Sequence, residues 1–230
     1  MRYPILTTVL RWLAAVLILR VLVTILANYP DYFPPDFNSL FLEGRAATFH
    51  GAYRAAFYLH ILSAPFVLLN GLILLNGYVR RRHPRWHRWL GRLQVVLLLL
   101  LVLPSSVVMS RHAFGGWQAG LSFVLLAAAT AACAIIGVVR ACQQRYDAHR
   151  RWMLRTYVLI CSAVALRLIS GTAGLFDVAS PEHAYIIASW CSWLLPVAAF
   201  EIMERWPVRP ATRSEDMRPV QTSETHAVLR

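Results

Sequence analysis

An arginine-rich stretch between two long apolar runs constrains the fold of this chain more than any other feature. Residues 79–92 read Val-Arg-Arg-Arg-His-Pro-Arg-Trp-His-Arg-Trp-Leu-Gly-Arg. Each flanking run is long enough to cross about 30 Å of hydrocarbon as a helix that rises about 1.5 Å per residue. Short arginine-rich loops stay on the cytoplasmic side of a membrane, so this stretch predicts the orientation of the neighbouring segments.

The composition agrees with a membrane protein. The 230 residues are 58% hydrophobic and 15% charged, and the net charge is +12. A soluble domain of this length could not bury that much apolar surface. Nearly all the positive charge lies in short loops, so membrane topology explains it and a nucleic-acid partner is not expected.

Apolar runs predict an all-α integral membrane protein, a bundle of six transmembrane helices with both termini in the cytoplasm. The basic residues, all of them arginine, lie mostly on the side of residues 79–92. A bacterial cytoplasmic (inner) membrane is the expected location. The polar tail, 207–230, is predicted to be a disordered cytoplasmic segment after a transmembrane domain of residues 1–206. The expected spans are 5–27, 54–78, 90–109, 117–139, 152–176 and 183–203.

The longest loop, residues 28–53, lies on the opposite side. Its length is typical of a lid or a binding element. Prolines interrupt its start, and we expect Phe37, Leu40, Phe41 and Leu42 to lie on the membrane face of a short interfacial helix.

Charged and polar residues within the spans are the strongest indication of a site, because a charge in hydrocarbon costs several kcal/mol unless it is paired or faces a cavity. Arg20, His60 and Arg167 are expected at one depth in the outer half of the bundle, on three different helices. No acidic residue lies within a span at that depth. Either outer-loop carboxylates reach the two arginines, or an anionic ligand group pairs with them. The alternative is that both arginines extend toward water or bond helix carbonyls, with His60 as an interhelical hydrogen-bonder.

Two similar basic motifs precede the third and fifth spans. Exposed helix amides together with arginines form an anion site that suits the phosphate of an anionic lipid at the cytoplasmic face. The alternative is that these arginines only set topology while nearby tryptophans anchor the interface. The motif residues are His87, Arg88, Arg92, His149, Arg150 and Arg155.

Histidine in a helical membrane bundle raises the possibility of haem b, which takes axial ligands from facing helices. His60 is the candidate ligand, paired with His112 or His183, each nearer the outer surface. A two-haem arrangement is not supported, because the fourth span lacks histidine. No hydrolase or phosphotransferase motif occurs, so the sequence assigns no catalytic residue and leaves enzymatic activity open.

Several of these motifs resemble a known family. Phe57-Tyr-Leu-His60-Ile, His87-Arg-x-x-Gly-Arg92, and His149-Arg-Arg-Trp-Met-x-Arg155 followed by Arg167 resemble the bacterial predicted-membrane-protein family called domain of unknown function 2306, over roughly residues 41–204. The resemblance implies a polytopic membrane protein and implies no activity. The signature positions that it implies are His60, His87, Arg92, His149, Arg155 and Arg167.

Three functions remain in view from the sequence. The first is binding of an amphipathic anionic or redox ligand, haem b or a quinone, in an outer-half pocket that includes Arg20, His60, His112 and Arg167. The second is a transporter or lipid-handling protein for an anionic substrate. The third is a non-catalytic accessory membrane subunit with a protein partner.

Overall fold

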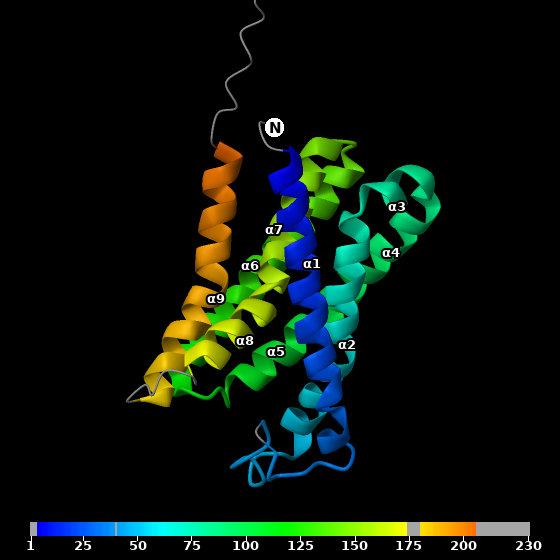
Figure 1. The fold of residues 1–230 in the computed structure, drawn as a ribbon. Coiled ribbons are helices and arrows are strands. Elements are labelled where there is room, and N and C mark those ends of the chain that lie inside the picture. Colours follow the sequence, from blue (N-terminus) through cyan, green and yellow to red (C-terminus); the bar gives the residue numbers. More distant parts are fainter. Residues whose placement is uncertain (1–3, 40, 174–179, 206–230) are drawn as a thin grey trace, which may run out of the picture.

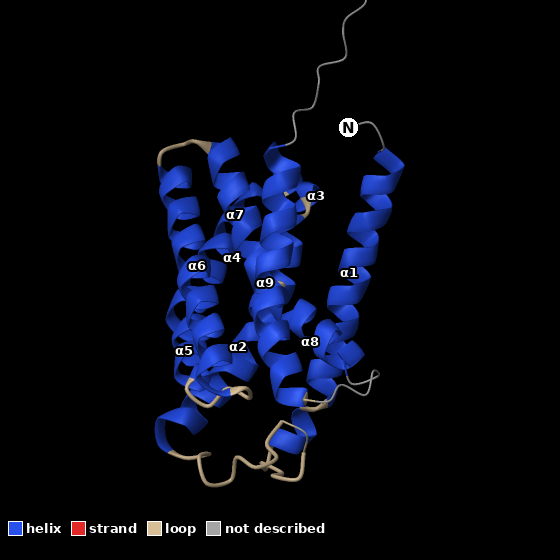
Figure 2. Ribbon diagram, turned by 90° about the vertical axis from the view of Figure 1, so that its left-hand side faces the viewer, coloured by secondary structure: helices blue, strands red, loops and turns tan. Residues whose placement is uncertain are grey.

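The chain folds as a bundle of helices, shown by a computed structural model that describes residues 4–39, 41–173 and 180–205 (Figures 1 and 2). These residues contain no β-strand. The longer helices run roughly along one axis, so they leave two ends of the bundle. The helices and short helical turns are α1 (Pro4–Ala27), η1 (Tyr29–Tyr32), α2 (Gly51–Leu75), α3 (Gly77–Arg82), α4 (Pro84–Leu97), η2 (Leu98–Val102), α5 (Leu103–Ser110), α6 (Gly116–Cys142), α7 (Tyr146–Ile160), α8 (Ser162–Ala173) and α9 (Pro181–Arg205).

Five helical segments are long and apolar enough to cross a membrane. They are Gly51–Leu75, Pro84–Ser110, Gly116–Cys142, Tyr146–Thr172 and Pro181–Arg205. α1 has 24 residues, and within it Trp12–Ala27 forms a shorter apolar helix. The multi-pass helical character expected from the sequence is therefore confirmed, with five candidate spans and an apolar first helix.

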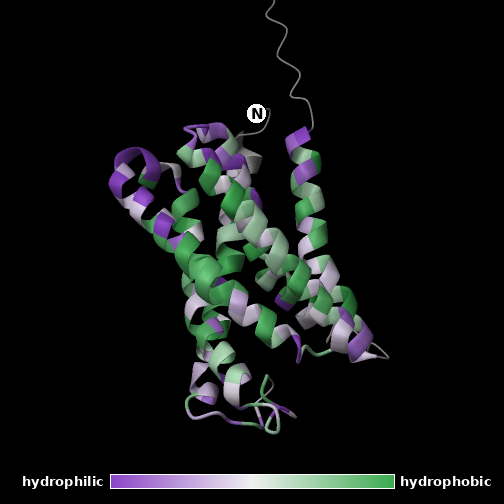
Figure 3. Ribbon diagram, turned by 180° about the vertical axis from the view of Figure 1, so that it is seen from behind, coloured by the Kyte–Doolittle hydropathy of each residue, from purple (hydrophilic) through white to green (hydrophobic). Residues whose placement is uncertain are grey.

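The two ends of the bundle are more hydrophilic than its middle (Figure 3). We call the end that carries the loop between α1 and α2 the loop end, and the opposite end, with α3 and the α6–α7 turn, the arginine end. Hydrophilic residues gather at both ends, while the middle of the bundle is mostly hydrophobic (Figure 3). Large apolar side chains such as Trp12, Leu100 and Leu195 are exposed along the sides of the helices. This arrangement suits a lipid bilayer around the middle of the bundle.

The third apolar run forms one bent helix with a wider turn inside it. Residues Leu98–Val102 adopt π-helical hydrogen bonding, between α4 and α5. Pro104 lies two residues after this turn, and proline lacks the N–H that would continue the α-helical ladder. Ser105 uses its hydroxyl to bond the Leu101 carbonyl at 2.5 Å. The π turn therefore lies where proline has freed helix carbonyls.

The loop between α1 and α2 differs from the sequence expectation. The prediction of an interfacial helix is wrong, because the described residues between η1 and α2 form turns. Leu40, one of the residues expected on that helix, lies outside the described residues. The side chain of Leu42 is completely buried. It packs with Tyr32, Phe49 and Phe57 in an aromatic cluster beneath the loop. Leu42 and Phe49 therefore pack onto the bundle, whereas Phe33 and Phe41 remain exposed.

A buried polar network joins α2, α4 and α7 in the half of the bundle toward the arginine end. The Asn70 amide donates to Gln94 Oε1 at 2.8 Å, and the Gln94 amide donates to the Val67 carbonyl at 2.9 Å. The Tyr157 hydroxyl donates to the Leu68 carbonyl at 3.1 Å. Interhelical hydrogen bonds of this kind hold membrane helices in one register.

Candidate ligand cavity

A cavity of about 330 Å³ lies between the helices toward the loop end. We call it the outer cavity. Its wall is built from α1, α2, η2, α5, α6, α7, α8 and α9, together with the loop between α1 and α2. Most lining side chains are apolar or aromatic. The polar and charged lining side chains include His60, Arg167, Arg45, His112, Tyr29, Tyr32, Tyr53, Tyr185, Ser106 and Thr130.

Arg167 is the principal charge of the outer cavity. Its Nη1 donates to the Ala163 carbonyl one turn earlier in α8, at 3.0 Å. Among the described residues, no carboxylate forms an ion pair with it. Asp177, one of the outer-loop carboxylates that the sequence offered as a partner, lies outside the described residues. The guanidinium therefore retains hydrogen-bond donors for a ligand group.

Three tyrosine side chains lie near the guanidinium of Arg167. Tyr29, Tyr32 and Tyr185 all lie within electrostatic range of Arg167. Burial raises the pKa of Tyr29 and of Tyr32 above 10.0, although the positive charge of Arg167 lowers each pKa in part. Both phenols are therefore neutral at neutral pH. The single hydroxyl hydrogen of Tyr29 bonds the Ile61 carbonyl, so Tyr32 is the phenol that can donate to a ligand.

His60 lies on α2, on the wall formed with α5. Its Nδ1 is 3.3 Å from the Ser105 hydroxyl. Ser105 has one hydroxyl hydrogen, and it serves the Leu101 carbonyl, so Nδ1 of His60 acts as the donor. The Nε2 lone pair then remains available as an acceptor or ligand. Ser105 of α5 therefore fixes the orientation of the His60 ring. The sequence did not identify this neighbour.

His112 also lines the outer cavity, from the turn between α5 and α6. Its ring packs edge-on against Tyr53, with ring centroids 4.9 Å apart. Gly115 and Gly116 follow with positive φ values of 85° and 65°, which glycine adopts without strain. This tight turn brings His112 over the loop end of the cavity.

Arg45 is a cavity residue that the sequence did not identify. It donates to the His112 carbonyl at 2.7 Å and to the Tyr53 hydroxyl at 3.0 Å. It also donates to the Phe41 carbonyl at 2.9 Å and lies over the Phe41 ring. Arg45 therefore ties the loop to the α5–α6 turn across the rim of the cavity. Its place in a long loop gave no sign of this.

The structure does not bring Arg20 to the cavity. Ile18, Val21 and Leu22 of α1 are buried, and they turn Arg20 outward, where it is exposed. His60 and Arg167, the other two residues expected at this depth, form their hydrogen bonds with residues other than Arg20. The equal-depth argument placed Arg20 with His60 and Arg167, but it did not account for the face of the helix.

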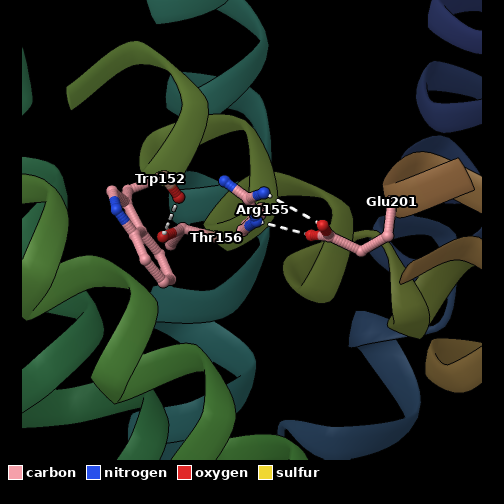
Figure 4. A network of polar contacts seen from close by, with 4 residues as sticks. All are labelled: Trp152, Arg155, Thr156 and Glu201. Carbon is pink, nitrogen blue, oxygen red and sulfur yellow. Dashed lines mark hydrogen bonds and ion pairs between the residues drawn. The ribbon is translucent and has the colours of Figure 1, made fainter. Parts of the chain in front are cut away.

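The basic motifs at the arginine end fall into separate environments. Arg155 does not offer a free charge, because Glu201 of α9 binds it in a bidentate ion pair at 2.5 and 3.0 Å (Figure 4). His149 Nδ1 lies 2.8 Å from the Gly137 carbonyl, and its ring is within electrostatic range of His87. The other motif residues, Arg88, Arg92 and Arg150, are exposed.

These observations define a class: a multi-pass helical membrane protein with a polar-headed cavity near one end. The chain belongs to the family of predicted membrane proteins named DUF2306, which it matches over residues 57–203. That segment contains His60, His87, His149 and Arg167. Comparison with curated proteins and with solved structures finds no match.

Proposed function

We propose that this membrane protein binds an amphipathic ligand in the outer cavity, with a carbonyl or anionic head group at Arg167 and an apolar body along the aromatic wall. One observation carries the proposal. Arg167 lines a largely apolar cavity and has no carboxylate partner among residues 4–39, 41–173 and 180–205. An arginine in such surroundings needs a negative or strongly polar partner.

A quinone suits the donors of the cavity best. Arg167 and the neutral phenol of Tyr32 are donors for one ring carbonyl. The volume of about 330 Å³ lies at the lower end of the range for small-molecule pockets. Stacking on tyrosine and phenylalanine rings favours a flat, apolar ring in the same space.

Haem b is less suited to this cavity. His60 offers a free Nε2, as an axial ligand would require. The other lining histidine, His112, packs its ring against Tyr53, and Arg45 holds its carbonyl. The second axial position would need His112 to leave these contacts.

Fluorescence titration with a short-chain ubiquinone tests the proposal on the detergent-purified protein, since quinones quench nearby tryptophan emission. A charged hydrogen bond contributes about 1.5–3 kcal/mol, so Arg167→Gln should weaken binding by about 10- to 100-fold. Arg20→Gln is the matched control: it removes an arginine from another apolar helix outside the cavity. Equal affinity of wild type and Arg167→Gln would refute the site.

A visible spectrum of the oxidised and dithionite-reduced protein, expressed with adequate haem supply, separates the two redox ligands. A Soret band that is lost in folded His60→Ala protein would show that the ligand is haem b and not a quinone. A colourless protein that still binds the ubiquinone supports the quinone.

The orientation is also proposed: six spans, with both termini and the arginine end in the cytoplasm of a bacterium, and anionic lipid at that end. Exposed Arg88, Arg92 and Arg150 support this arrangement through the positive-inside rule. Labelling Cys142, which is exposed at the end of α6, with a membrane-impermeant maleimide in oriented vesicles tests it. Reaction from the outside of right-side-out vesicles would reverse the orientation.

A further inference from the structure

We propose that the ligand of the outer cavity reaches it sideways from the bilayer, between α1 and α8, so that the ligand class is membrane-dissolved rather than water-soluble. This inference rests on the proposed function, because it names the source of that ligand. It also separates the quinone hypothesis from transport of a water-soluble anion.

The arginine end of the cavity is closed by packing. Val67 and Leu98 line the cavity floor and are each only 1% exposed. Directly beyond them, the Gln94 amide bonds the Val67 carbonyl, and Tyr157 bonds α2 at Leu68. A solute would have to break these buried hydrogen bonds in order to pass, which costs about 1–3 kcal/mol for each group left unpaired.

The loop end is bridged by side chains. Arg45 spans the rim from the loop to the α5–α6 turn through the Phe41 and His112 carbonyls. Phe114, in that turn, packs edge-on against Tyr185 of α9 with ring centroids 5.4 Å apart. Beneath the loop, Phe57 and Leu42 are completely buried. Among the residues that the structure describes, bonded and stacked groups therefore bridge this end of the cavity.

The α1–α8 side is different. Thr24 of α1 and Ala163 and Arg167 of α8 line the cavity and are all exposed. The hydroxyl of Thr24 donates to the Arg20 carbonyl and the guanidinium of Arg167 to the Ala163 carbonyl, so both side-chain hydrogen bonds stay within their own helices. Nearer the arginine end the two helices do pack, through Val21 and Val164, so the opening is confined to the level of Arg167.

The arrangement of the helices agrees with a lateral opening. α1 stands apart from α9, and α8 lies between them in both views (Figures 1 and 2). At this opening, Arg167 lies at the depth where a lipid-like molecule in the bilayer would present its polar head group. A membrane-dissolved quinone or a similar amphipathic molecule meets that geometry, whereas a hydrated anion would have to cross hydrocarbon first.

Thiol labelling tests the route without any bound ligand. Ser106 lines the cavity, so Ser106→Cys places a reporter there in a protein whose four cysteines, Cys133, Cys142, Cys161 and Cys191, are replaced by alanine. A second protein retains Cys142 alone as an exposed control. Each is reconstituted in phosphatidylcholine vesicles and treated with a long-chain N-alkyl maleimide or with a sulfonated maleimide on both faces.

We expect the cavity thiol to react with the alkyl reagent at least tenfold faster than with the sulfonated one, after normalisation to Cys142. Ala163→Trp should slow the alkyl reaction at least tenfold, and Ala132→Trp, at an exposed alanine of α6 away from the cavity, should not. Thr24→Trp replaces Ala163→Trp if that variant does not fold.

Fast reaction with the sulfonated reagent would overturn the lateral route, as would an alkyl rate that neither tryptophan variant changes or a thiol that reacts with neither reagent. The ubiquinone titration is independent of these results. Failure of the route with a normal Arg167 effect, or the reverse, therefore identifies which of the two proposals is wrong.

Discussion

The ion pair between Arg155 and Glu201 gives a quantitative prediction. Both guanidinium–carboxylate hydrogen bonds are short, at 2.5 and 3.0 Å, and the guanidinium also lies over the rings of Trp152 and Phe200. The two side chains are 20% and 28% exposed. Exposed pairs contribute about 0.2–1 kcal/mol, whereas removing one partner of a buried pair costs about 3–5 kcal/mol. We therefore expect Glu201→Gln to lower the free energy of unfolding by about 2 kcal/mol.

Thermal unfolding of the detergent-purified protein measures this effect, with an expected fall in Tm of about 4–8 °C for a chain of this length. Glu204→Gln, at an exposed position one turn along α9, removes the same charge and should change Tm by less than about 2 °C. A double-mutant cycle with Arg155→Gln isolates the pair. A coupling energy below about 0.5 kcal/mol would show that α9 is held by other contacts and would refute the reasoning.

Three further predictions concern packing and the loop end. A Cβ at Gly71 would lie 2.4 Å from Tyr157 Cε2, whereas a Cβ at Gly91 meets nothing within 4 Å. Gly71→Ala should therefore lower the free energy of unfolding by about 1–3 kcal/mol, measured as a fall in Tm, and Gly91→Ala should not lower it. Equal effects of the two substitutions would contradict this prediction. Burial raises the pKa of Tyr32, so the folded protein keeps the phenol proton to a higher pH than the unfolded chain, and the free energy of unfolding falls as the pH rises above the ordinary tyrosine pKa of 10.0. Tyr32→Phe should reduce this loss of stability, as measured by unfolding curves between pH 9 and pH 12. Curves that the substitution leaves unchanged would contradict the prediction. Arg45→Gln removes three hydrogen bonds of the loop and should therefore raise the rate of amide hydrogen exchange in residues 41–50. Residues 116–142 serve as the internal control. An unchanged exchange rate in residues 41–50 would contradict the bridging role of Arg45.

The helical architecture could be predicted because it depends on composition and length. Apolar runs longer than about 20 residues admit few structures other than membrane helices. Depth along a helix follows from counting residues, and this counting placed His60 and Arg167 at one level. Both line the outer cavity, as does His112.

Counting residues does not reveal the direction in which a side chain points. Arg20 lies at a suitable depth but on the exposed face of α1, because Ile18, Val21 and Leu22 occupy the packed face. Arg45 and Leu42 were missed for a related reason. Their positions depend on loop contacts that have no period in the sequence, so only the folded chain brings Arg45 to His112.

Charge pairing between distant helices was likewise beyond the sequence. Arg155 resembles the other basic residues of its motif, and Glu201 is separated from it by 46 positions. The identity of the partner depends on how α7 and α9 pack. A motif can therefore combine residues with different roles, one neutralised by an ion pair and others exposed.

The π-helical turn at Leu98–Val102 has a consequence for how this segment tolerates insertions and deletions. The buried residues Gln94, Leu98 and Val102 recur every fourth position, a spacing that a regular α-helix would carry roughly 80° around its axis. The wider turn keeps them on one side, so that Gln94 serves the polar network while Ser106 reaches the outer cavity. Loss of a single leucine codon from this leucine-rich run would leave hydropathy almost unchanged. The π turn could absorb that loss by becoming a regular α-helical turn, which would leave the flanking residues in place. Gain of a single leucine codon, which a hydropathy profile would also barely register, would instead rotate the following residues by about 100° and remove Ser105 from His60.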